Sequence, residues 1–343
     1  MTEAIHVLDP QGDVLLTLDP NTTFLVFSNA LTKASPYFKT CLEEPWNGSQ
    51  TGRGGRRELE AGGWDEGAFL TVLRLIHGLN QDVPQKVDLT RMTKIAMVVD
   101  YYQCADAVSR FTSPWLISQH CRLWRVTSIQ KLELWIFLAW VFKDHSTFKH
   151  ATCNAAASLD RRFVTRRVPI PDGIVETINR DRLTYLSGRF AVLDNLLQEL
   201  QQPESTLACS AECRSTLFSS LSEQMRGKGL FDRSACGDFE RFSQANTWSL
   251  LRDFNDPQTC SPGNADGEGV SADTENVPCS LKKILKERFR DAPAPSPGLN
   301  LRQFMQYRGR DRWGDDHRAW EDSLWALPLD EPEPSVDTNH VQW

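Results

Sequence analysis

The pattern of apolar and polar positions near the N-terminus changes from strand-like to helical within a few residues. Residues 13–18 (DVLLTL) and 23–27 (TFLVF) are β-rich runs joined by a DPNT turn, so they predict a β-hairpin. The stretch that follows predicts two short helices, the first capped by Ser28 and the second starting at Pro36 after a Ser35 cap. Helices this short need a surface to pack on, which the hairpin supplies.

A third strand and a series of helices are predicted next. Residues 57–61 (RELEA) are strand-like, Asp65 and Asp88 each precede an apolar pattern with helical spacing, and residues 105–120 predict a further, shorter helix. The histidine that follows the helix after Asp65, His77, is predicted to be a buried or helix-end residue rather than a catalytic base.

This order of elements resembles a BTB/POZ domain, particularly those of filamentous fungal proteins that carry a helical region after the domain. The resemblance rests on four motifs: GDVLLTL, FSNALTKASPYFKTCLE, DEGAFLTVLRLIHG and VDLTRMTKIAMVVDYYQCADAV. It implies an α+β fold in which residues 8–119 form the BTB/POZ-like domain, followed by a mostly α-helical domain. It also implies that the chain forms a homodimer through the first helix and the adjoining surface.

Two positions depart from the BTB/POZ pattern. In many animal BTB repressors an acid at the position of Asp13 faces a basic residue near the start of the first helix, but residues 27–29 (FSN) contain no cation. Adaptors of cullin-type E3 ubiquitin ligases often carry a hydrophobic-x-Glu motif that contacts the cullin. Residues 69–71 align there, and Thr71 stands in place of the acid.

The rest of the chain is predicted to be mostly helical. We assign residues 120–255 to a helical domain, 256–278 to a disordered acidic linker, 279–327 to a C-terminal helical segment of the same domain, and 328–343 to a disordered acidic tail. Four leucines along one predicted helix are expected to pack in the core, and further helical faces are expected around Met225 and Phe289. The leucines are Leu193, Leu196, Leu197 and Leu200.

Three cysteines are the candidate metal ligands of the helical domain. Fungal BTB relatives of this type often show P-x-P-x-G-I, then Cys-x3-Cys, then His-x2-Cys before G-L-x-L; here the cysteines are Cys209, Cys213 and Cys279, but Asn276 replaces the histidine. Two thiols on one helical turn would face the same way, and with a fourth ligand they could hold a structural zinc. We favour three reduced thiols and no cofactor. Substitute fourth ligands would be Cys236, Cys260 or His317.

Composition excludes several classes of function. The formal net charge of -7 argues against a general nucleic-acid or anionic-membrane binder. The arginine runs 161–167 and 308–313 are therefore expected to be solvated or to make intramolecular contacts. The start shows no secretory signal, and nine scattered cysteines suit reduced thiols, so we expect the nucleus or the cytoplasm. No hydrolase or metalloprotease signature appears, which predicts a protein that is not an enzyme.

These observations predict a protein–protein interaction module that self-associates through its BTB/POZ-like domain and recruits an unknown protein partner. One alternative is a substrate adaptor of a cullin-type E3 ubiquitin ligase, with a cullin as the partner. Another is a transcriptional or RNA-linked regulator that uses the arginine runs. Membrane and nucleic-acid partners are not expected from the charge.

Overall fold

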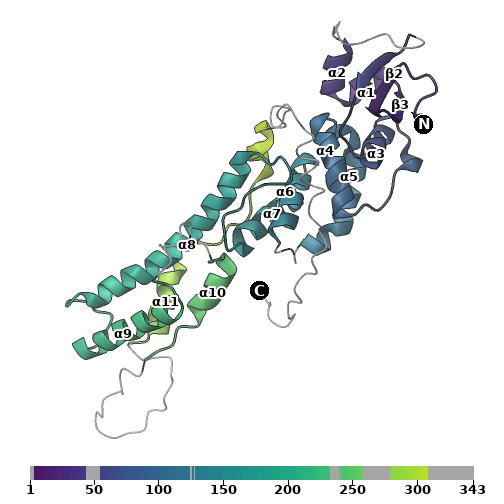
Figure 1. The fold of residues 1–343 in the computed structure, drawn as a ribbon. Coiled ribbons are helices and arrows are strands. Elements are labelled where there is room, and N and C mark those ends of the chain that lie inside the picture. The colour runs from purple at the N-terminus through teal and green to yellow at the C-terminus, as the bar shows by residue number, and fades with distance from the viewer. Residues whose placement is uncertain are drawn as a thin grey trace. The chain divides into compact units, whose positions relative to one another are not determined.

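The computed structural model describes residues 4–43, 55–123, 126, 128–231, 239, 241–257 and 279–307 (Figure 1). They form two compact units, each built from segments that are separate in the sequence. Of the described residues, unit 1 comprises 4–151, 165–172 and 300–307, and unit 2 comprises 152–164 and 173–299. The predicted tail at 328–343 and residues 258–278 of the predicted acidic linker lie outside the described residues.

Unit 1 contains a sheet in which the predicted hairpin and third strand are confirmed. Strands β2 (Val14–Asp19) and β3 (Thr22–Val26) are antiparallel, and the amide of Asn21 in their turn donates to the Asp19 carboxylate at 2.8 Å. Strand β4 (Arg57–Glu60) pairs parallel to β2. All five residues of β3 are buried, as expected for an inner strand covered on both faces.

One strand was not predicted from the sequence. Strand β1 (Ala4–Val7) pairs parallel to β3, so that the sheet order is β1-β3-β2-β4 and β1 lies at an edge. Its four residues are too short a run to show alternation of apolar and polar positions. The strand precedes residue 8, the predicted start of the BTB/POZ-like domain.

The helix pair that follows the hairpin forms as predicted, except for the first cap. Helix α1 (Ser28–Ala34) is followed by α2 (Pro36–Glu43), and the Ser35 hydroxyl accepts the Phe38 amide at 3.1 Å, confirming the second cap. The prediction that Ser28 caps α1 is wrong, because Ser28 is the first residue of the helix and its hydroxyl donates to Asp13 at 2.6 Å. The Asp13 carboxylate also accepts the Ser28 amide, so the cap comes from a residue ahead of β2.

Four further helices complete most of unit 1. They are α3 (Glu66–Ile76), α4 (Leu89–Tyr101), α5 (Ala105–Leu123) and α6 (Ile129–Val141). The predicted caps Asp65 and Asp88 are confirmed, each accepting a backbone amide at 2.8 Å. Helix α5 has 19 residues and continues through Pro114, so it is longer than predicted. The predicted domain boundary after residue 119 falls inside this helix. No helix in the described part of the chain is long and apolar enough to cross a membrane.

The described secondary-structure elements of unit 2 are all helices. Helix α7 (His145–Ser158) crosses from unit 1 into unit 2, and is followed by α8 (Asp172–Gln201), α9 (Ala211–Gly227), α10 (Gln244–Arg252) and α11 (Leu281–Arg290). The amide of Lys282 donates to Asp256 at 2.9 Å, so this first residue of the predicted disordered linker binds the first turn of α11 beside the N-cap Ser280.

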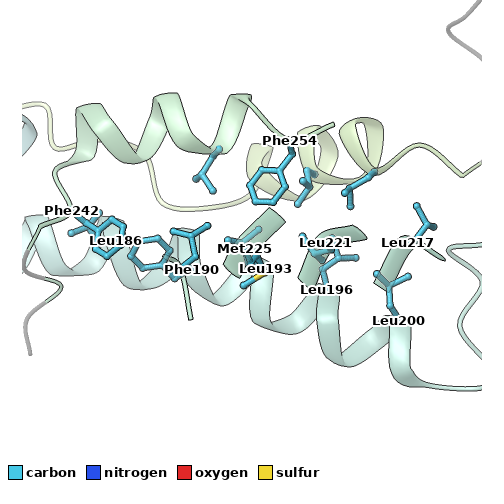
Figure 2. Close-up of a cluster of buried hydrophobic side chains, with 14 of the residues drawn as sticks. Leu186, Phe190, Leu193, Leu196, Leu200, Leu217, Leu221, Met225, Phe242 and Phe254 are labelled. Carbon is cyan, nitrogen blue, oxygen red and sulfur yellow. The ribbon is translucent and has the colours of Figure 1, made fainter. Parts of the chain in front are cut away.

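The core of unit 2 lies between α8, α9 and α11 (Figure 2). The leucine stripe on α8 is part of this core, as predicted, with Leu193, Leu196 and Leu200 buried and Leu197 partly buried. Figure 2 shows side chains of α8 and α9 pointing toward one another, among them Leu193 and Met225. The stripe therefore packs internally rather than forming a groove for a partner.

A glycine fixes how closely the chain after α11 approaches α8. A Cβ atom at Gly188 would lie 2.4 Å from the ring of Pro293, which is closer than any ordinary contact. The absence of a side chain at Gly188 therefore allows residues beyond α11 to lie directly against the α8 backbone.

Candidate functional site

The three candidate cysteines come together at the N-termini of two helices. Cys209 lies just before Ser210, the cap of α9, Cys213 is the third residue of that helix, and Cys279 precedes Ser280, the cap of α11. Their Sγ atoms all lie within 4.8 Å of one another. The prediction that Cys209 and Cys213 share one helical turn is wrong in detail, since Cys209 precedes the helix and the bend at the cap brings the pair together.

The three thiols lie beside backbone amides at the starts of two helices. The backbone amide of Cys209 donates to the Cys279 Sγ at 3.2 Å, and the two helix N-termini add positive partial charge. Cys213 and Cys279 are buried, whereas Cys209 is exposed, and none of the three forms a disulfide. An electrophile or a soft metal would reach the cluster from the side of Cys209.

The cluster supplies three ligands of a tetrahedral zinc site. Thiolates bound to one zinc lie about 3.8 Å apart, so modest contraction of this cluster would bring all three into range. The fourth position would need a ligand from elsewhere. Asn276 and the predicted substitutes Cys236, Cys260 and His317 all lie outside the described residues. The described residues thus fit either an incomplete metal site or three neighbouring thiols.

A second candidate surface is the β1 edge of the unit 1 sheet. Ile5 and Val7 are 54% and 57% exposed, and they share one face of the strand because they are two residues apart. His6 points the other way: its ring stacks on Phe24 at 5.1 Å, and its Nε2 lies 3.2 Å from a carboxylate oxygen of Glu66. The strand is thus anchored through His6 and presents two aliphatic side chains outward.

The positions that the resemblance singles out lie elsewhere in unit 1. Asp13 faces Ser28 rather than a cation at 27–29. Burial raises the pKa of Asp13, but the hydrogen bonds from Ser28 and the charge of Arg57 outweigh burial, so that the pKa is lowered from its usual value. Thr71, which replaces the cullin-contacting acid, is buried and donates to the Gly67 carbonyl at 2.7 Å.

His77 has the structural role predicted for it. It follows α3, its Nδ1 lies 2.8 Å from the Leu73 carbonyl oxygen, and its Nε2 accepts the Phe27 amide at 3.1 Å. Only the neutral ring can accept a hydrogen bond at Nε2. Burial lowers the pKa of His77 and so also favours the neutral ring. Both ring nitrogens are occupied by backbone partners, so the ring is not placed as a general base.

One acid that sequence analysis overlooked organises the first arginine run. Glu133 lies in the apolar helix α6, and one of its carboxyl oxygens accepts the backbone amides of Arg166, Arg167 and Val168 at 2.7, 2.6 and 3.2 Å. Burial raises the pKa of Glu133, although these bonds and the charge of Arg167 oppose the rise. The available signal was a single acid inside a continuous apolar stretch. Glu133 thus binds the backbone at the end of the run at 161–167, where the Arg166 side chain is exposed and that of Arg167 is buried. The run at 308–313 lies outside the described residues.

The described elements of unit 1 follow the order of hairpin, helix pair, strand and helices on which the resemblance to BTB/POZ domains rests. That resemblance remains a prediction from motifs and element order. In comparisons with known proteins, no protein-family model, no curated protein and no solved structure matches this chain.

Proposed function

We propose that this protein is an interaction module in which unit 1 pairs with a second copy of itself through the β1 edge. The observation that carries the proposal is an edge strand with two outward aliphatic side chains, Ile5 and Val7. Edge strands present unpaired backbone donors and acceptors and are usually protected by charges or bulges. At β1 these two positions are apolar, which suits pairing with another strand.

A second copy is the simplest partner for this edge. Two β1 strands running antiparallel across a two-fold axis would join the sheets of two protomers, and the same residues would contribute from each side. Ile5 and Val7 of both copies would then meet on one face of the joined sheet. Covering each of these side chains would stabilise the dimer by roughly 1 kcal/mol. Helix α1, which the BTB/POZ resemblance implicates in pairing, begins at Ser28, two residues after β3, the strand beside β1.

The sequence carries no nucleophile–base motif, so the proposed role is binding. We propose that the helical region recruits the partner protein. The cullin-adaptor alternative gains no support from the described residues, since Thr71, at the position of the contacting acid, is buried. The RNA-linked alternative rests on two arginine runs, of which only 161–167 is described, and no observation there favours it.

Light scattering after size-exclusion chromatography of the full chain tests the pairing. At micromolar concentration the wild type should be a dimer, and Ile5→Lys with Val7→Lys should give a monomer, because two cations on the edge oppose pairing. Ile117→Lys is the matched control, since Ile117 is 73% exposed and lies on α5 rather than on the sheet. A monomeric wild type, or equal dissociation by the control, would refute the proposal.

A further inference from the structure

A cavity of about 620 Å³ opens in unit 2 between α8, α10 and α11. Its volume is within the range of small-molecule sites, roughly 300 to 1,000 Å³. One part of its wall is apolar and comes from α10, α11 and the residues after α10. The apolar side chains are Trp248, Leu251, Phe254, Leu285 and Phe289.

The other described residues that line the cavity are all basic. Lys282, Lys286 and Arg290 recur every fourth residue on α11, so they form one row along the helix, next to the apolar pair Leu285 and Phe289. Arg252 from α10 and Arg189 from α8 complete the set. No acid is among the described residues that line the cavity, and none of the five cations forms an ion pair with a described carboxylate.

Arg189 is the most informative of these cations because it is only 6% exposed. Its guanidinium carbon lies 5.2, 5.8 and 5.5 Å from the ring centres of Tyr185, Trp248 and Phe289. One terminal nitrogen donates to the Phe289 carbonyl at 2.9 Å, while the Nε–H has no hydrogen-bond partner among the described residues. A buried cation held by rings, carbonyls and the Tyr185 side chain has given up its hydration without gaining an opposite charge.

We propose that this cavity binds an amphipathic small-molecule anion. The apolar chain or ring of such a ligand would lie against Leu285, Phe254 and Trp248. Its carboxylate or other oxyanion head group would lie near Lys286 and Arg290 and bring negative charge toward Arg189. The carboxylate of Asp256 accepts the Ser280 hydroxyl and the Lys282 backbone amide, and neither of these bonds involves the side chains of the basic row. The ligand class follows from the pairing of one apolar wall with one cationic wall.

Isothermal titration calorimetry of the full chain with three probes tests the ligand class. Sodium decanoate has both parts, decanol has the chain without the charge, and acetate has the charge without the chain. Decanoate should bind at least about tenfold more tightly than either of the others, and more weakly as salt is added. If decanol bound as tightly as decanoate, the cavity would be an unspecific apolar surface. If acetate bound as tightly, it would be a surface of charges alone. Either result, or the absence of decanoate binding, would overturn the proposal.

Two charge reversals on the same helix locate the site. Lys286→Glu should weaken decanoate binding by about tenfold or more, because it places a like charge beside the head group. Lys283→Glu is the matched control, because Lys283 is exposed on α11 but does not line the cavity. The Kd of this variant for decanoate should change less than about twofold. Trp248→Ala should also weaken binding. Equal effects of the two reversals would overturn the assignment, and far-UV circular dichroism checks that each variant is folded.

Discussion

The carboxyl group of Glu133 on α6 accepts the backbone amide of Arg167 at 2.6 Å. The amides of the residues on either side of Arg167 donate to the same oxygen, so one side chain satisfies three consecutive backbone donors. Residues 165–172 belong to unit 1 although they follow a segment of unit 2. Glu133 therefore holds this returning segment against α6.

Replacing Glu133 should destabilise unit 1 strongly. Glu133→Ala removes the acceptor and leaves buried amides without partners, which should cost about 3 kcal/mol or more. Glu133→Gln keeps an oxygen acceptor of similar shape and should cost less than half as much. Urea unfolding followed by circular dichroism measures both. Equal losses in the two variants would show that the segment does not depend on the acceptor.

Stability should depend on the protonation of His77. Burial lowers its pKa below the usual 6.5 in the folded state, so the unfolded chain binds the proton more readily. The stabilisation by the neutral ring is therefore complete above pH 6.5 and is lost as the pH falls through the lower, folded-state pKa. The difference in unfolding free energy between wild type and His77→Gln should shrink between pH 7 and pH 5. A constant difference over that interval would contradict the assigned role of the Nε2 atom.

The close approach at Gly188 predicts a large effect from one methyl group. Gly188→Ala would place a Cβ 2.4 Å from Pro293, and relieving this clash should cost about 1 to 3 kcal/mol. Gly227→Ala is the control, because nothing lies within 4 Å of a Cβ at that position at the end of α9. The control should be stabilised by at most about 1 kcal/mol. Thermal unfolding compares the two, and similar melting temperatures would refute the clash.

The cysteine cluster is expected to contain no stoichiometric zinc. Three thiols leave one coordination position open, whereas structural zinc sites are closed by four protein ligands. Elemental analysis of protein purified without chelator, and unfolding with and without EDTA, measure this directly. We expect no change on chelation. About one zinc per chain, with several kcal/mol lost to the chelator, would instead make unit 2 a metal-dependent fold.

The sequence was sufficient for elements whose signals are local. The caps at Ser35, Asp65 and Asp88 were predicted because a capping side chain and its amide lie within three residues of each other. The turn between β2 and β3 and the buried leucines of α8 were predicted for the same reason: spacing along the chain encodes them directly.

Features that depend on distant partners could not be predicted in this way. Asp13 caps α1 from 15 residues away, and no pattern near Ser28 reveals it. Glu133 was hidden in an apolar stretch because periodicity cannot show which backbone amides an acid will meet. The row of Lys282, Lys286 and Arg290 resembles an ordinary solvated helix face until α8 and α10 are placed beside it. Proximity of Cys279 to Cys209, 70 residues away, followed only from the family resemblance.

The interleaving of the two units has a consequence for synthesis on the ribosome. Unit 2 spans residues 152–164 and 173–299, whereas unit 1 starts earlier and takes in residues from 300 onward. There, Phe304 contacts Phe148 at 6.1 Å between ring centres. The N-terminus of a chain leaves the ribosome first. Unit 1 therefore begins to emerge before unit 2, but its last described contacts form only after all of unit 2 has emerged. Unit 1 therefore cannot be fully assembled during translation until the segment around Phe304 has left the ribosome.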